Sequence, residues 1–151
     1  MSFKDQPFKD RFKKLGDEAE GAWERNIGRD YRWERFGWDR TALRIGGMPA
    51  MMQNRPDYVT ETTLYECMGF GRDRIFKMKH HKLSALKDWD AIMETVVFIW
   101  DGTERRWTTV RVSDMWDIVA RSPVDHFPEG TPYAVIRPDE LGRVWYRDTP
   151  S

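Results

Sequence analysis

Two carboxylates, Asp57 and Glu66, are the side chains whose type and spacing in this sequence best suit chemistry. They fall in residues 57–60 and 63–68, which are rich in aromatic and β-branched residues and read as two short strands around a polar reversal. Because Pro56 cannot donate a ladder hydrogen bond, Asp57 stands at the very start of the first strand, where a short turn lets it face Glu66. Two facing carboxylates can coordinate Mg²⁺, a hard cation that takes one or two carboxylates together with water and phosphate oxygens.

A basic segment follows this predicted hairpin. Residues 73–89 have apolar side chains at helical spacing from Met78 onward, and residues 69–87 contain six Lys or Arg against one Asp. A helix from this segment would lean on the acidic hairpin, where an ammonium group could steady an attacking water at a metal site. The alternative interpretation is a solvated surface whose ion pairs each contribute about 0 to 1 kcal/mol.

The remaining elements place these residues in an α/β arrangement. Apolar residues recur every three or four positions in residues 7–27 and predict a first helix, with Glu20 at the edge of the apolar stripe. Residues 39–54 contain glycine and proline and predict a loop. Further strands are predicted at 31–38, 94–100, 106–112, 133–136 and 144–146, with a helix at 115–121 capped by Ser113 or Asp114 and a loop at 123–132.

Composition limits the class of protein. A chain of 151 residues with 40% hydrophobic content predicts one domain, residues 1–151. Net charge is zero, so the chain as a whole lacks the basic footprint of a nonspecific nucleic-acid binder, and any such surface must be local. One cysteine fits a reducing compartment, and the longest apolar run, residues 96–100, is far too short to span a membrane. These features predict a cytoplasmic protein without a membrane segment.

Other chemistries are less well supported by the spacing. Cys67, His80 and His81 lack the paired spacing of a closed zinc site. Strand alternation turns Cys67 to the face away from Glu66, which disfavours a cysteine nucleophile in the acidic site. The segment GFGRD has neither of the glycine-rich patterns of nucleotide-binding loops, so ATP use is not indicated.

The order Pro56-Asp57, a short gap, Glu66 on an apolar strand, a glycine and a lysine-bearing helix resembles the PD-(D/E)xK nuclease superfamily. That superfamily includes restriction endonucleases, phage exonucleases and Holliday-junction resolvases. The segment GFGRDRIFKMKHHKLSALKDW is also similar to small nuclease-like proteins of phages of actinobacteria, a likeness that covers residues 15–107. The resemblance implies an α/β fold with a restriction-endonuclease-like core, in which an N-terminal helix precedes a mixed central β-sheet flanked by helices.

The same resemblance implies roles for particular residues. Asp57 and Glu66 correspond to the two metal-binding carboxylates, and the backbone carbonyl of Cys67 to a third ligand. In resolvase-like members a glutamate on the first helix, preceded by a glycine at similar spacing, completes the metal site. Glu20 resembles that residue, and Glu24, one turn further on, is the second choice.

The third motif position departs from the family pattern, because Met68 stands where a lysine is usual. In some members the lysine comes from the following helix, so Lys77 or Lys79 is the expected catalytic ammonium, with Lys77 preferred. Two residues apart on a helix point about 200° away from each other, so only one of the two is expected in the site. The residues expected to grip phosphate are Arg72, Arg74 and Lys82.

The resemblance therefore implies a Mg²⁺-dependent or Mn²⁺-dependent endonuclease that hydrolyses DNA, either resolvase-like or specific for another DNA structure. A homodimer is compatible with it, and a phage-encoded chain would work in the host cytoplasm. The alternative, from a different class, is a noncatalytic module that keeps the nuclease fold and binds DNA or a protein. Met68 is the residue that favours this alternative.

Overall fold

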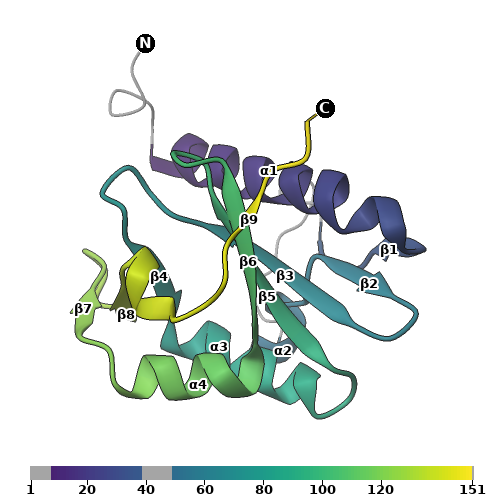
Figure 1. Cartoon of the computed structure of the whole chain (residues 1–151). Helices are drawn as coiled ribbons and strands as arrows, with labels where there is room; N and C mark the ends of the chain where they lie inside the picture. The colour runs from purple at the N-terminus through teal and green to yellow at the C-terminus, as the bar shows by residue number, and fades with distance from the viewer. Residues whose placement is uncertain (1–7, 39–48, 151) are drawn as a thin grey trace.

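The computed structural model describes residues 8–38 and 49–150. Figure 1 shows their arrangement. The helices are α1 (Phe8–Asn26), α2 (Ala50–Gln53), α3 (His80–Asp90) and α4 (Val112–Ala120), with 3₁₀ turns η2 (Gly28–Asp30) and η3 (Pro138–Leu141). The strands are β1 (Trp33–Arg35), β2 (Tyr58–Thr60), β3 (Leu64–Gly69), β4 (Phe76–Lys79), β5 (Thr95–Asp101), β6 (Arg106–Arg111), β7 (Val124–His126), β8 (Pro132–Ile136) and β9 (Tyr146–Arg147).

A mixed six-stranded sheet forms the centre, in the order β1-β2-β3-β5-β6-β9. All neighbouring strands are antiparallel except β3 and β5, which are parallel and pair Glu66 with Val97. Parallel neighbours need a long crossover connection, and here the crossover contains β4 and α3. It brings the start of α3 back to the strand that carries Glu66.

Helices cover both faces of this sheet (Figure 1). α1 packs on one face, where Trp23 stacks on Tyr58 with ring centres 4.1 Å apart. α3 and α4 pack on the other face, with Leu86 and Met115 fully buried. These contacts confirm the predicted α/β class, with an N-terminal helix and a mixed central sheet flanked by helices.

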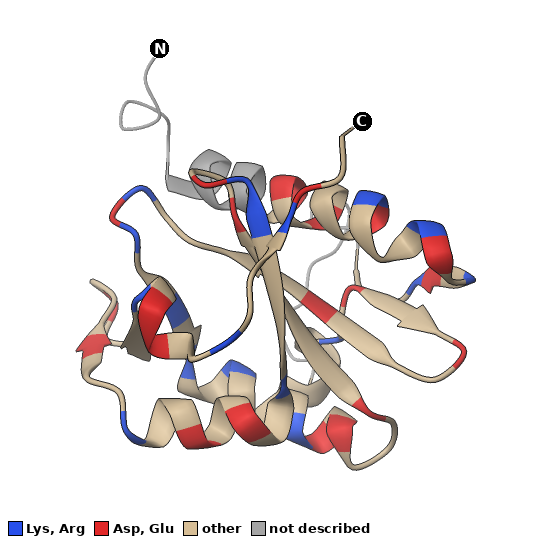
Figure 2. Ribbon diagram, in the orientation of Figure 1, with Lys and Arg blue, Asp and Glu red and all other residues tan. Residues whose placement is uncertain are grey.

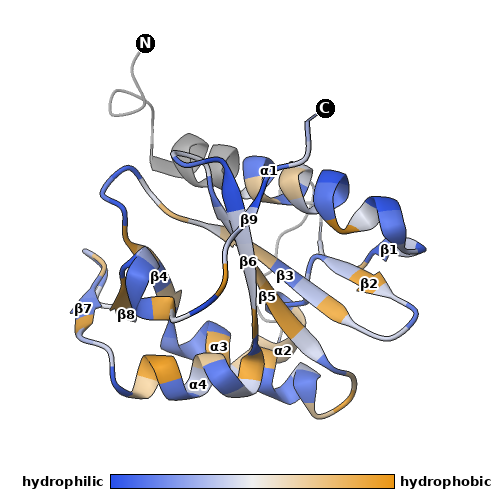
Figure 3. Ribbon diagram, in the orientation of Figure 1, coloured by the Kyte–Doolittle hydropathy of each residue, from blue (hydrophilic) through white to orange (hydrophobic). Residues whose placement is uncertain are grey.

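Strand β5 lies at the middle of the sheet and is buried along its whole length. Its sequence TVVFIWD shows no alternation of polar and apolar residues, which is typical of a strand covered on both faces. Figure 3 shows β5 as a hydrophobic stretch between the helical layers. The predicted hairpin of residues 94–100 and 106–112 corresponds to β5 and β6, and it lies beside the Glu66 strand as expected.

A second sheet of three strands, in the order β4-β8-β7, was not predicted. The helix predicted from Met78 onward is wrong at its start, because residues 76–79 form β4 and α3 begins only at His80. In β4 the side chains of Phe76 and Met78 are buried while the two lysines between and after them are partly exposed. This alternation of period two is the signal of a strand, and pairing with β8 stabilises it.

Smaller differences concern the connections. The predicted loop at 123–132 contains β7, and α4 begins earlier than expected, with Arg111 rather than Ser113 or Asp114 at its N-cap. Within the predicted loop 39–54, residues 50–53 form the short helix α2, and residues 39–48 lie outside the described part of the chain.

Charges are mixed over the surface rather than separated. Figure 2 shows acidic and basic residues interspersed along the described part of α1 and along α3, whereas the charged residues of α4 are all acidic. None of the helices in residues 8–38 and 49–150 is sufficiently long and apolar to cross a membrane.

Candidate active site

The hairpin of β2 and β3 brings Asp57 and Glu66 together where β2 begins, inside the central sheet. Tyr58 pairs with Tyr65, so the residues on either side, Asp57 and Glu66, stand opposite each other. Both side chains are inside the protein, with 6% of Asp57 and 2% of Glu66 exposed. The N–H of Cys67 donates a hydrogen bond of 2.8 Å to Asp57 Oδ2, which fixes the carboxylate against the strand.

Burial next to a like charge makes this pair electrostatically unfavourable. Burial and the neighbouring Glu66 carboxylate raise the pKa of Asp57 well above its usual range. The hydrogen bond from Cys67 and the ammonium of Lys82 act in the opposite direction but do not cancel the effect. A site of this kind favours a bound cation or a proton, since either would relieve the repulsion.

The two residues that follow β1 hold the main chain of Asp57 in place. The N–H groups of Phe36 and Gly37 both donate to the main-chain oxygen of Asp57, at 2.9 and 3.2 Å. A Cβ at Gly37 would lie 3.1 Å from Asp57 Cα and 3.2 Å from Pro56 O, which is too close for an unstrained side chain. A glycine at position 37 therefore suits this close approach, a role that the sequence pattern did not indicate.

Glu20 approaches the acidic pair from α1. Burial raises the pKa of Glu20, and the charge of Asp57 raises it further, although Arg35 opposes both effects. Arg35 Nη2 lies 3.3 Å from Glu20 Oε2, so β1 contributes a counter-charge to this carboxylate. Glu24, the second choice for this role, instead accepts a hydrogen bond of 2.6 Å from the Tyr58 hydroxyl.

Cys67 contributes its backbone to the site, whereas its thiol faces away. The N–H and C=O of one strand residue point to the same edge, so the carbonyl of Cys67 is directed to the edge where its N–H meets Asp57. The side chain lies in the core between the sheet and α1, where burial raises the pKa of the thiol well above its usual range. A protonated, buried thiol is a poor nucleophile.

Lys82 is the ammonium group that reaches the acidic pair. It lies in the first turn of α3, and its Nζ is 3.3 Å from Glu66 Oε2. Its charge also lowers the pKa of Asp57, which places it within electrostatic reach of both carboxylates. The sequence predicts a phosphate-binding role for Lys82. Lys82 reaches Glu66 instead because α3 begins at His80, which places Lys82 in the first turn of the helix.

Neither Lys77 nor Lys79 enters the acidic pair. Both lie on β4, two residues apart on one face of a strand, so the predicted separation of about 200° around a helix does not apply. Lys77 Nζ is 3.4 Å from Asp73 and 5.5 Å from the ring centre of Tyr133. Lys79 lies over Phe127, and burial, with a smaller effect of Lys82, lowers its pKa.

The arginines expected to grip phosphate lie in the turn between β3 and β4. Arg72 is exposed there. Arg74 extends instead to Asp101 at the end of β5, a fully buried aspartate to which it donates through both terminal nitrogens. Arg74 therefore has a partner inside the protein.

The donor set of the acidic pair suits a hard cation. Among residues 8–38 and 49–150, no three Asp, Glu, His or Cys side chains form a ready metal-binding cluster, and His80 and His81 join no such group with Cys67. Mg²⁺ needs fewer protein ligands, since it is usually held by one or two carboxylates with water and substrate phosphates. Two carboxylates and the outward carbonyl of Cys67 meet that requirement.

These features define a mixed α/β protein in which a buried acidic pair on the central sheet lies beside the ammonium group of Lys82. The sequence matches no protein-family model, and it matches no curated protein. The structure is similar to that of Hjc from Archaeoglobus fulgidus, a Holliday junction resolvase from an archaeal hyperthermophile. That similarity has a TM-score of 0.42 and 11% sequence identity, and it covers 86% of this chain and 90% of the other.

Proposed function

We propose that this protein is a divalent-cation-dependent endonuclease that hydrolyses DNA phosphodiesters. The observation that carries the proposal is the buried pair of Asp57 and Glu66 with Lys82 Nζ 3.3 Å from Glu66. Two carboxylates that face each other in a buried site, with the ammonium of Lys82 beside them, match the needs of metal-assisted phosphoryl chemistry.

In this proposal Asp57, Glu66 and the carbonyl of Cys67 hold Mg²⁺ or Mn²⁺. A metal ion held there stabilises the charge that develops on the scissile phosphate and lowers the pKa of its bound water. The N–H of Cys67 keeps the Asp57 carboxylate in place through its 2.8 Å hydrogen bond. Glu20 is an outer carboxylate next to Asp57, and Arg35 holds it in position.

Lys82 supplies the ammonium that Met68 cannot. Met68 shares the strand face of Glu66 but packs against the hydrophobic core, so it leaves the position of the motif lysine without charge. Lys82 approaches the same carboxylate from α3 and can orient the attacking water by donating a hydrogen bond to it. Lys79, whose pKa is affected by Lys82, and the exposed Arg72 are the candidates for contact with the DNA backbone.

Cleavage of a panel of DNAs tests the proposal: a four-way junction, a flap, a linear duplex, a supercoiled plasmid and a single strand, each with Mg²⁺ or Mn²⁺. Asp57→Asn and Glu66→Gln should abolish cleavage, and Lys82→Met should slow it by about a hundredfold or more. Glu61→Gln is the control for the acids, because Glu61 is exposed on the turn of the same hairpin. Lys77→Met is the control for the lysine.

Thermal melts of each variant would separate loss of chemistry from loss of fold. Equal losses in Lys82→Met and Lys77→Met would contradict the assignment of Lys82. If the folded wild-type protein cleaves no DNA with either metal but binds DNA in a salt-dependent way, the noncatalytic module is the correct description.

A further inference from the structure

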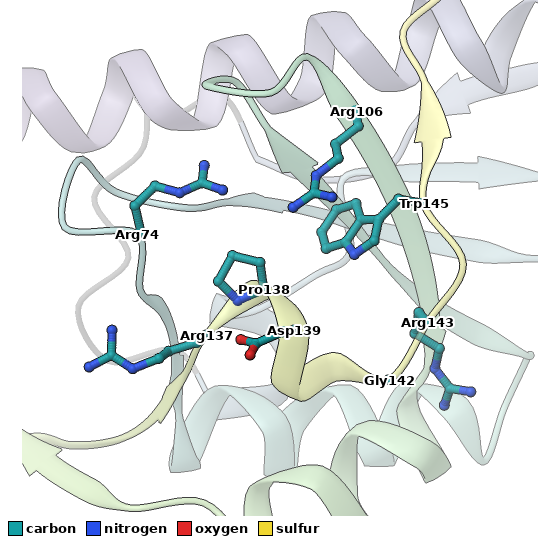
Figure 4. Close-up of a pocket in the computed structure, with 8 residues that line it drawn as sticks. All are labelled: Arg74, Arg106, Arg137, Pro138, Asp139, Gly142, Arg143 and Trp145. Carbon is teal, nitrogen blue, oxygen red and sulfur yellow. The ribbon is translucent and has the colours of Figure 1, made fainter.

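A second concave site, which shares no residue with the acidic pair, lies where the C-terminal segment crosses β6 (Figure 4). Its volume is 450 Å³, which falls within the usual size of small-molecule pockets. Four of the eight lining residues are arginines, and the rest include Trp145, Pro138 and Asp139. The sequence did not indicate this site, because its walls come from three separate parts of the chain: Arg74, Arg106 and residues 137–145.

One buried carboxylate orients two of these arginines. Asp101 is fully buried, and it accepts hydrogen bonds from Arg74 and, at 2.9 Å, from Arg106 Nε. Burial alone would raise the pKa of Asp101, but the hydrogen bonds from the two guanidinium groups outweigh burial and lower it. Asp101 therefore stays ionised and neutralises only one of the two positive charges.

The remaining N–H groups of these arginines are available to a ligand. A guanidinium has five N–H donors, and Arg106 uses its Nε–H for Asp101. Within the described residues, the two terminal nitrogens of Arg106 have no acceptor. The guanidinium carbon lies 4.5 Å from the ring centre of Trp145, which supports it from one side. Figure 4 shows Arg74 and Arg106 pointing toward each other above Pro138 and Trp145.

The backbone of Arg74 adopts an uncommon conformation. Its φ is 61°, in the left-handed region that is uncommon for residues other than glycine. The paired hydrogen bonds to Asp101 accompany this conformation, so the guanidinium is held at the pocket rather than extended into solvent.

The other two arginines of the pocket are paired with acidic side chains. Arg137 pairs with Glu140 and Arg143 with Asp114, so the charges of these two arginines are already compensated. Asp139 is the acidic residue of the pocket wall itself. The positive charge that Asp101 leaves unneutralised is thus at Arg74 and Arg106, and the carboxylates that oppose an anion are Asp139 in the wall and Glu104, whose charge acts on Arg74.

We propose that this pocket binds a phosphate group at Arg74 and Arg106, with the apolar part of the same ligand against Trp145 and Pro138. Planar guanidinium groups match phosphate oxygens in geometry, and here Asp101 holds them in place before any ligand binds. A phosphate of a DNA strand and that of a free nucleotide share this chemistry. The inference uses none of the acidic-site residues, so it stands or fails independently of the proposed nuclease activity.

Titration followed by ¹H–¹⁵N NMR tests the proposal at fixed ionic strength. The probes are inorganic phosphate, dAMP and a short oligothymidylate without terminal phosphates. The Trp145 indole N–H signal, assigned by its loss in Trp145→Phe, and the Arg106 Nε–H signal should shift and saturate. Saturation by phosphate or dAMP would identify a free phosphate ligand, and saturation by the oligothymidylate alone would identify the backbone of a strand. Both results support the site.

Two variants and one control decide whether the arginines are responsible. Arg106→Gln should weaken binding of the effective probe by about tenfold, through loss of a charge-assisted hydrogen bond. Asp139→Asn should tighten binding of the same probe about threefold, because it removes a negative charge from the pocket wall. This variant keeps both hydrogen-bonded pairs at Asp101, so it still tests the site if Arg106→Gln fails to fold. Arg121→Gln, at an exposed position after α4, should change nothing. Absence of saturable shifts with all three probes, or equal affinities in wild type and Asp139→Asn, would overturn the proposal.

Discussion

Replacing Asp57 by asparagine should stabilise the metal-free protein at neutral pH. In the folded state the Asp57 carboxylate is buried beside Glu66, and these two effects raise its pKa well above the usual range. A carboxyl group whose pKa is raised by folding contributes stability that is fully present below about pH 4 and is lost as the pH rises through the folded-state pKa. Asparagine carries no charge, and its side-chain oxygen can still accept the hydrogen bond from the N–H of Cys67.

The size of the gain follows from the charges around Asp57. Two carboxylates about 4 Å apart repel each other by about 4 kcal/mol at the effective dielectric constant of a protein site. Lys82, 3.3 Å from Glu66, offsets part of this repulsion. A net gain of about 1 to 3 kcal/mol in the free energy of unfolding is therefore expected near pH 7.5, equivalent to a rise of roughly 3 to 10 °C in Tm.

Urea unfolding between pH 4 and pH 8, with a chelator present, measures this gain. The difference between Asp57→Asn and wild type should be small at pH 4 and grow with pH. Glu61→Gln, which removes an exposed carboxylate from the same hairpin, should show little difference at any pH. A gain that does not depend on pH, or a loss of stability at pH 7.5, would refute the reasoning about the acidic pair.

Three further outcomes follow from the structure. Mg²⁺ or Mn²⁺ at about ten times its Kd should stabilise the wild-type protein by about 1.4 kcal/mol, which raises Tm by roughly 3 to 5 °C. Asp57→Asn should not show this rise, and equal rises in both proteins would argue against binding at Asp57. The Cys67 thiol, buried and with a raised pKa, should react with a disulfide reagent at pH 8 only after unfolding, so rapid reaction of the folded protein would contradict its burial. Trp23→Ala should lower the free energy of unfolding by about 3 to 5 kcal/mol, because removing the buried ring that stacks on Tyr58 leaves a cavity. In the same denaturation assay Trp33→Ala should cost clearly less, because Trp33 is 36% exposed.

The local pattern of the sequence was sufficient to predict the acidic hairpin. Alternation of side chains along a strand depends only on neighbouring residues, so the shared face of Glu66 and Met68 and the opposition of Asp57 could be inferred without the fold. The same holds for α1, whose apolar stripe placed Glu20 at the edge of the core. The mixed sheet also followed from the order of strands and helices, because the two predicted hairpins needed a common sheet.

The tertiary structure decided which ammonium joins the carboxylates. Residues 76–79 form β4 because they pair with β8, more than fifty residues later in the chain, and that pairing sets the start of α3 at His80. Once the helix begins there, Lys82 lies beside Glu66 while Lys77 and Lys79 stay on the strand. Likewise, Arg74 and Arg106 meet at Asp101 only after β5 and β6 have paired. Such contacts join residues far apart in sequence, so the periodicity within a single segment cannot predict them.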